Sequence, residues 1–145
     1  MCTLLCTAAL LLASANAAEP QVPTEIQEAV FAYAIVSESF SLVDCLQVSG
    51  ANPPDEVLSA LTKKFPHVVP MSQCDVDAEA GTTHRGTGRE ARYISLSGYE
   101  RVDDKHAKIH VATRTRSMTG RGSTLLLEVG KRGWYVSGGE QRWVE

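Results

Sequence analysis

The chain has 145 residues, a length that fits one domain. Its hydrophobic fraction of 43% and charged fraction of 21% are those of a globular protein and exclude a largely disordered chain. The net charge of −3 lacks the strong basic balance of nucleic-acid-binding proteins. Because only 6% of the residues are aromatic, the core must be mainly aliphatic.

Residues 1–17 have the pattern of a secretory signal peptide. They carry no charged side chain, and an apolar run extends from Leu4 to Ala13. Such a run has the length of a signal-peptide core and is too short to span a bilayer. The segment Ala15-Asn16-Ala17 fits the small-x-small cleavage pattern, so we expect cleavage after Ala17 and a periplasmic or secreted domain of residues 18–145. One feature departs from the usual pattern, because no Lys or Arg precedes the apolar run. The alternatives to a signal peptide are a buried N-terminal helix and a lipid anchor on Cys6.

Cleavage would remove Cys2 and Cys6 and leave Cys45 and Cys74. Two cysteines in an oxidising compartment usually pair, so we predict a Cys45–Cys74 disulfide. Closing a loop of roughly 30 residues would stabilise the domain by about 3.6 kcal/mol on the chain-entropy model. Two buried free thiols are the alternative. A catalytic dithiol is not expected, because the spacing of these cysteines is unlike Cys-x-x-Cys.

Two helices are predicted in the first half of the chain. Thr24 and Gln27 have the spacing of a capping box, and apolar residues follow at helical intervals, which predicts a helix over 24–38. A strand is predicted over 40–48. Asn52 is a candidate cap for a second helix, which Pro66 ends.

The second half alternates apolar and polar residues with a period of two. A short extended piece at 68–69 and a polar loop at 75–88 precede this pattern. Short turn-like segments separate the predicted strands, so neighbouring strands should pair antiparallel. The strands are predicted at 91–101, 106–117, 123–129 and 134–144.

These elements predict an α+β fold. Its order would be an N-terminal helix, a strand, a second helix and a four-stranded antiparallel meander. Packing the first helix on the meander would bury both apolar faces in one core.

The C-terminal strand carries a resemblance to known folds. Trp134-Tyr135-Val136, followed by Gln141-Arg142-Trp143-Val144, is similar to the ending of cystatin-like and nuclear-transport-factor-2-like domains. The segments around Cys45 and Cys74 also resemble an uncharacterised family of small exported bacterial proteins with this fold. The resemblance implies the fold and leaves the activity open, because these domains include enzymes, ligand carriers and interaction modules.

No catalytic, cofactor-binding or metal-binding motif is present, so we predict none of these sites. His106 and His110 share a strand face, but a strand places them roughly 13 Å apart, too far for easy shared ligation. Trp134 and Trp143 are expected to pack in the core or on the sheet rather than to stack on a ligand. Enzymes of the resembled fold use a carboxylate or histidine as a base in a cavity, and the candidates here are His67, His84, Asp44 and Glu38.

Charge is divided unevenly along the predicted mature chain. Residues 18–84 hold ten acidic and two basic side chains, whereas residues 85–145 hold twelve basic and seven acidic ones. The two halves could face each other, or both could face water; alternatively, the second half presents a basic patch to an anionic partner. The candidate patch residues are Arg92, Lys108, Arg114, Arg116 and Arg142.

The sequence therefore predicts a non-catalytic module that binds an unknown protein or small molecule. We expect no nucleic-acid partner and no membrane span. The alternatives are a small cavity-based enzyme of the lyase or isomerase class and an inhibitor or accessory protein that acts through its loops.

Overall fold

The computed structural model describes residues 19–37, 43–115 and 120–144. Two α-helices and one 3-10 helix accompany eight strands in these ranges. In chain order the elements are α1 (Thr24–Ser37), β1 (Val43–Val48), α2 (Asp55–Lys64), β2 (Val68–Pro70), η1 (Met71–Gln73), β3 (Cys74–Asp77), β4 (Gly81–His84), β5 (Ala91–Arg101), β6 (His106–Arg114), β7 (Gly120–Gly130) and β8 (Gly133–Val144).

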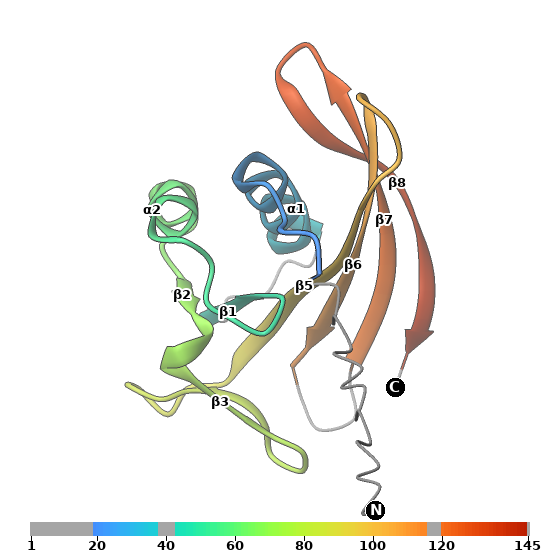
Figure 1. Ribbon diagram of the computed structural model, residues 1–145. Coiled ribbons are helices and arrows are strands. Elements are labelled where there is room, and N and C mark those ends of the chain that lie inside the picture. The colour runs from blue at the N-terminus through green and yellow to red at the C-terminus, as the bar shows by residue number, and fades with distance from the viewer. Residues whose placement is uncertain (1–18, 38–42, 116–119, 145) are drawn as a thin grey trace, which may run out of the picture.

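Six strands form one mixed, mostly antiparallel sheet in the order β2-β1-β5-β6-β7-β8. Strand β1 pairs in parallel with both β2 and β5, whereas β5 to β8 form an antiparallel meander. The sheet curves, with α1 against its concave side and α2 beside α1 near β1 and β2 (Figure 1). The α+β class is thus confirmed, but the sheet is larger than the predicted four strands.

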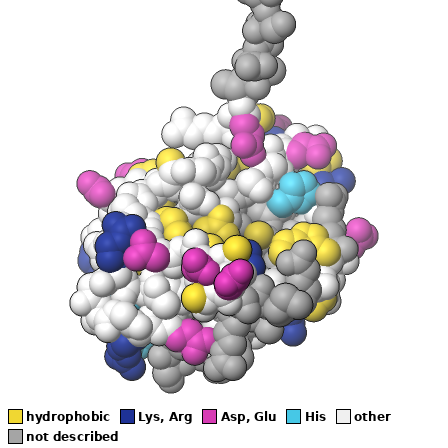
Figure 2. Space-filling model, turned by 90° about the horizontal axis from the view of Figure 1, so that it is seen from below, with side chains coloured by type: hydrophobic (Ala, Val, Ile, Leu, Met, Phe, Trp, Pro, Cys, Tyr) yellow, Lys and Arg dark blue, Asp and Glu magenta, His cyan; other side chains and the backbone are white. Residues whose placement is uncertain are grey.

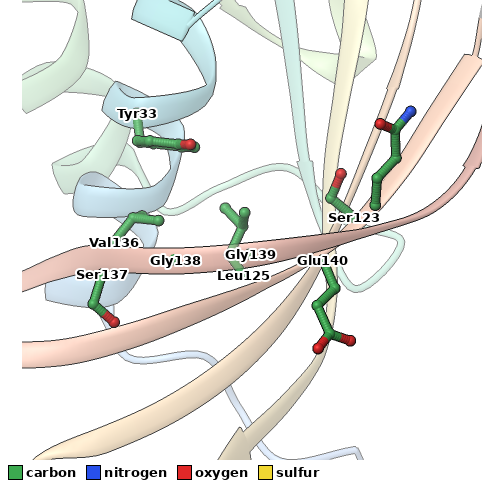
Figure 3. Close-up of a pocket in the computed structure, with 9 residues that line it drawn as sticks. Tyr33, Ser123, Leu125, Val136, Ser137, Gly138, Gly139 and Glu140 are labelled. Carbon is green, nitrogen blue, oxygen red and sulfur yellow. The ribbon is translucent and has the colours of Figure 1, made fainter.

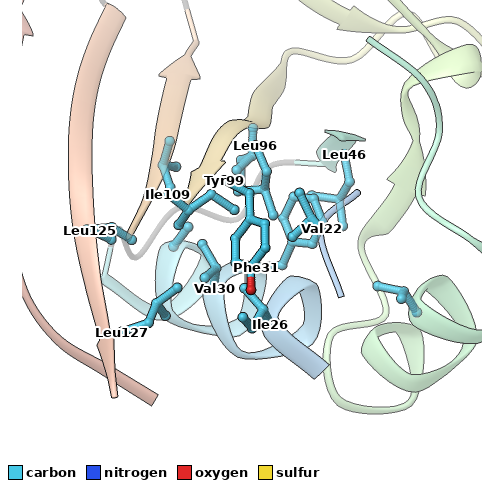
Figure 4. Packing of buried hydrophobic residues seen from close by; sticks show 14 of the residues in the cluster. Val22, Ile26, Val30, Phe31, Leu46, Leu96, Tyr99, Ile109, Leu125 and Leu127 are labelled. Atoms are coloured by element: carbon cyan, nitrogen blue, oxygen red, sulfur yellow. The ribbon is translucent and has the colours of Figure 1, made fainter. Parts of the chain in front are cut away.

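The core lies between α1 and the concave side of the sheet. Apolar side chains of α1, including Ile26, Val30 and Phe31, point toward the strands and are fully buried (Figure 4). They meet Ile109 and Leu127, which occupy alternate, inward-facing positions of β6 and β7. Because side chains alternate along each strand, one face of the sheet is apolar, and this face packs against α1.

The predicted caps of both helices differ in the structure. The carbonyl of Pro23 accepts hydrogen bonds from the amides of Ile26 and Gln27, so Pro23 occupies the cap position and Thr24 is the first residue of α1. Asn52 does not cap α2. Its side chain bridges instead to Ser72, 20 residues along the chain, through two hydrogen bonds of 3.0 Å.

The predicted loop at 75–88 is wrong, because β3 and β4 form a two-stranded antiparallel hairpin. The Asp77 carboxylate accepts hydrogen bonds from the amides of Glu79 and Ala80, which fixes the turn. The amide of Thr82 donates to the carbonyl of Thr115 and holds the hairpin against the end of β6. Strands of four residues are too short to show a clear period in sequence, and these contacts stabilise them from outside.

The Cys45–Cys74 disulfide is present, with the Cα atoms 6.3 Å apart. It joins β1 to the start of β3 and packs with Ala91 in a small apolar cluster apart from the main core. Both cysteines are buried. Their bond closes a loop over residues 45–74, which contains α2, and therefore restrains that segment.

The predicted leader lies outside the described residues. Within the described ranges, no helix has the length and apolar content needed to cross a membrane.

Candidate functional site

A groove runs between α1 and the concave side of β6, β7 and β8. It consists of two adjoining hollows of about 280 and 230 Å³. Both hollows are lined by Tyr33, Ser123, Leu125 and Gln141, so we treat them as one site. Ligand pockets are typically concave and partly apolar, and each hollow alone is slightly smaller than a usual small-molecule pocket.

The groove follows from which residues occupy the inward positions of the meander. Leu125 and Leu127 contribute apolar side chains to the core, but Ser123 occupies the next inward position of β7. A serine is too short to fill the space that a leucine would fill. The aromatic ring of Tyr33 projects from α1 toward β7 and β8, on the same side of the sheet as Ser123 (Figure 3).

Tyr33 forms one wall of the groove and is 46% exposed. Thr113 and Gln141 add a hydroxyl and an amide, and Val111 contributes to the apolar floor. The groove therefore combines an aromatic surface with uncharged hydrogen-bonding groups, an arrangement that suits an amphipathic molecule.

Two charged residues lie along the groove. Glu140 points away from Tyr33, toward the opposite side of the sheet (Figure 3). Arg121, an exposed residue of β7, lines the hollow at the Ser37 end of α1 and already takes part in an interaction within the protein. The positive charge of Arg121 is therefore on the helix side of the sheet, and the carboxylate of Glu140 is not.

The four candidate bases do not gather in the groove. Asp44 is buried and bound to Arg92, and His67 is exposed in the turn before β2. His84 hydrogen-bonds Thr87 beyond the β3–β4 hairpin. Glu38 lies outside the described residues. None of the three described candidates lines either hollow.

The candidate basic patch is not assembled as predicted. Arg92 is only 1% exposed and is part of the core, which corrects its assignment to a surface. Lys108 is exposed on the opposite side of the sheet from α1. Arg114 donates to the carbonyl of Ala78 and so supports the hairpin turn. Arg116 is outside the described residues, and for Arg142 only the backbone, in β8, is described.

The histidines of β6 each have a local partner. Nδ1 of His106 lies 2.8 Å from the carboxylate of Asp103 in the β5–β6 turn. The amide of Lys105 and the His106 ring hold the pKa of Asp103 below its ordinary value. Nδ1 of His110 lies 2.9 Å from the Thr124 hydroxyl. Over the described ranges, no three His, Cys, Asp or Glu side chains are grouped as metal ligands.

Figure 2 shows the end of the molecule that faces down in Figure 1. Hydrophobic side chains gather near the middle of this end, and acidic and basic side chains lie around them. The described residues therefore present mixed charge here rather than one basic surface.

No model of a known protein family matches this chain. No curated protein and no solved structure shows significant similarity to it either. The resemblance to cystatin-like and nuclear-transport-factor-2-like domains stays a prediction, and any function must be argued from the site itself.

Sequence reasoning missed the groove because its lining residues carry no recognisable motif. The helical spacing of apolar residues over 24–38 includes Tyr33 and predicts that it is buried, whereas the structure leaves it 46% exposed. One signal was present: Thr113 follows Ile109 and Val111 on one strand face, and Ser123 precedes Leu125 and Leu127 on another, so each polar residue stands at the end of an apolar row. Polar groups in line with core residues indicate where a core opens to water or ligand.

Proposed function

We propose that this protein is an exported, non-catalytic binding module that holds a small amphipathic molecule in the groove between α1 and β6–β8. The observation that carries the proposal is the open, half-exposed wall formed by Tyr33, facing Ser123 and Gln141 across the groove. An aromatic ring and uncharged polar groups can bind an apolar body and a polar end at the same time.

A catalytic role has less support from the same residues. General acid–base catalysis needs a titratable group within hydrogen-bond reach of the substrate. Asp44, the most deeply buried candidate base, is held by Arg92 in the core and does not line the groove. Of the charged residues that line the groove, Glu140 points away from Tyr33 and Arg121 already takes part in an interaction, so the lining suits recognition more than proton transfer.

Export is the second part of the proposal. The disulfide supports it, because such bonds persist mainly in oxidising compartments. The test is N-terminal sequencing of protein recovered from outside the cytoplasm. We expect a new N-terminus at Ala18, whereas an intact Met1 on that material would contradict cleavage.

Binding is tested by titrating the purified protein with anilinonaphthalene sulfonate, a fluorescent amphipathic probe. We expect saturable binding, with the backbone amide signals of Tyr33, Ser123 and Gln141 shifting most in nuclear magnetic resonance spectra. The groove-filling variant Ser123→Phe should weaken binding by about tenfold, equivalent to about 1.4 kcal/mol.

The matched control is Ser97→Phe on β5. Ser97 is exposed, pairs with His110 on the face of the sheet opposite α1, and lines neither hollow. This variant adds the same ring on the other side of the sheet and should bind the probe like the parent protein. Equal loss in both variants, or unchanged binding by Ser123→Phe, would place the probe outside the groove and overturn the proposal.

A further inference from the structure

A second binding surface lies on the face of the sheet opposite α1, which we call the outer face. Trp143, near the end of β8, is 44% exposed, yet its indole ring lies closely over two glycines of β7. A Cβ atom built on Gly122 would be 2.0 Å from the indole nitrogen, and one on Gly120 would be 2.8 Å from the far edge of the ring. The glycines therefore allow the indole to lie against the backbone.

The strands next to this ring also present small side chains. Ala112 of β6 pairs with Gly122, and Ser95 of β5 pairs with Ala112, so a low floor extends sideways from the indole. Tyr93, beside Ser95 on the same face, stands at the far side of this floor. Two strand spacings separate β5 from β7, which is about 10 Å.

Polar groups at the edge of the floor are oriented by hydrogen bonds. The Tyr93 hydroxyl donates to Oε1 of Gln47, and the Ser95 hydroxyl lies 3.5 Å from the same oxygen. On β6 and β7, Nδ1 of His110 and the hydroxyl of Thr124 form a hydrogen bond of 2.9 Å. Arg114 reaches toward the carbonyl of Ala78, so its guanidinium group is committed to the hairpin turn.

We propose that this surface binds a neutral, pyranose-type saccharide, stacked on the Trp143 indole. A sugar ring has one face of weakly polar C–H groups, which packs on the flat face of an aromatic ring, and a rim of hydroxyl groups, which hydrogen-bond to amides and hydroxyls. The row of Ala112 and Ser95 beside the indole is uncharged. Arg114, which pairs with both Tyr93 and Gly120, lies next to this row, but its guanidinium group donates to the carbonyl of Ala78. The uncharged row therefore matches a neutral ligand better than an ionic one. The exposed indole is held in place before binding, which lowers the entropic cost of stacking.

This inference concerns the outer face and is independent of the groove. The saccharide surface and the groove lie on opposite sides of the same sheet. The groove-filling variant Ser123→Phe should therefore leave saccharide binding unchanged.

The experiment uses fluorescence of the full protein. Trp134 packs against the core, so Trp134→Phe leaves Trp143 as the single tryptophan reporter. Maltohexaose, cellohexaose and hexa-N-acetylchitohexaose are titrated separately. With at least one of them we expect a saturable shift of the emission to shorter wavelength, as the sugar covers the indole.

Two variants test the geometry, and isothermal titration calorimetry measures their binding. Trp143→Ala should weaken binding by about tenfold or more, the size expected for loss of one stacking contact. Gly122→Ala keeps the indole but displaces it, so it should weaken binding by a similar factor. Gly138→Ala is the control, because a Cβ atom there meets only Leu126 Cδ1 at 3.9 Å. Thermal unfolding checks that each variant is folded.

The outcomes separate the saccharide from other occupants. Binding that Trp143→Ala and Gly122→Ala both lose, and Gly138→Ala retains, supports the proposal. The absence of binding to all three saccharides at millimolar concentration would overturn it, as would binding that Trp143→Ala leaves intact. A dimer of the parent protein that becomes monomeric in Trp143→Ala, seen by light scattering, would assign this face to a second copy and would also overturn it.

Discussion

Arg92 on β5 and Asp44 on β1 form an ion pair that is almost completely withdrawn from water. Nε of Arg92 donates to Oδ1 of Asp44 at 2.7 Å, and the two side chains are 1% and 5% exposed. The same guanidinium group donates to the carbonyl of Ile35 in the last turn of α1. The pair thus links two parallel strands to the helix that covers them.

Removing one partner of this pair should strongly destabilise the fold. Asp44→Ala leaves the Arg92 charge buried without its carboxylate, and we expect a loss of about 3–5 kcal/mol in the free energy of unfolding. Urea denaturation at neutral pH measures this loss. The double variant Asp44→Leu with Arg92→Met should lose less than Asp44→Ala alone, because no charge is left buried.

The control for that experiment is the exposed pair of Arg85 and Asp75. Its Nη2–Oδ1 distance is also 2.7 Å, but more than half of each side chain is exposed. Asp75→Ala should change stability only slightly, because water and salt screen an exposed pair. Similar losses at both pairs would contradict the role assigned to burial.

The disulfide should provide a measurable share of the stability. Cys45 and Cys74 are 29 residues apart, and on the chain-entropy model their bond is worth about 3–4 kcal/mol. We expect the double variant Cys45→Ala with Cys74→Ala to unfold at lower urea concentration by the corresponding amount. A reducing agent should destabilise the parent protein and leave this variant unaffected. Two thiols that alkylate readily in the native parent protein would contradict the bond.

Gly98 should tolerate alanine less well than Gly50. Both have positive φ, +59° and +81° respectively, so an alanine is strained at either position. At Gly98, however, a Cβ atom would lie 2.3 Å from Cδ2 of His110, whereas at Gly50 nothing lies within 4 Å. We expect Gly50→Ala to cost about 1 kcal/mol and Gly98→Ala about 2–4 kcal/mol in urea denaturation.

A second variant separates the two contributions at Gly98. Adding His110→Ala to Gly98→Ala removes the clash and should recover part of the lost stability, although His110→Ala alone removes a contact. If the double variant is no more stable than expected from adding the two single losses, the clash is not the cause.

The turn between β3 and β4 should make stability depend on acidic pH. The amides of Ala80 and Glu79 donate to Asp77 and hold the pKa of its carboxyl below the ordinary value of 3.8. A lowered pKa in the folded state stabilises the protein above pH 3.8, and this contribution disappears as the pH falls through the folded-state pKa. The melting temperature of Asp77→Ala should therefore lie below that of the parent at neutral pH and approach it in acid.

Glu79→Ala serves as the control in the same turn. It removes a neighbouring carboxylate but keeps the backbone amide that donates to Asp77. Its difference in melting temperature from the parent should be small and should not follow the same profile in acid. A constant gap between Asp77→Ala and the parent down to low pH would contradict the assignment.

Local signals in the sequence were enough to predict the α+β class, the first helix and the two cysteines that pair. Strand β5 begins and ends at the predicted residues, 91 and 101, because its alternation is long and bounded by a clear turn. The β3–β4 hairpin was missed, because its four-residue strands are too short to show a period and depend on contacts with β6 and the Asp77 turn.

Tertiary structure alone decided the relations between distant segments. Parallel pairing of β1 with β5 brings Asp44 beside Arg92, 48 residues away, and turns a predicted surface arginine into a buried one. In the same way, Tyr33 and Ser123 form a groove only because α1 lies across β7. Alternation along a strand shows which side chains share a face. Which face is covered, and by what, depends on how strands and helices far apart in the chain pack together.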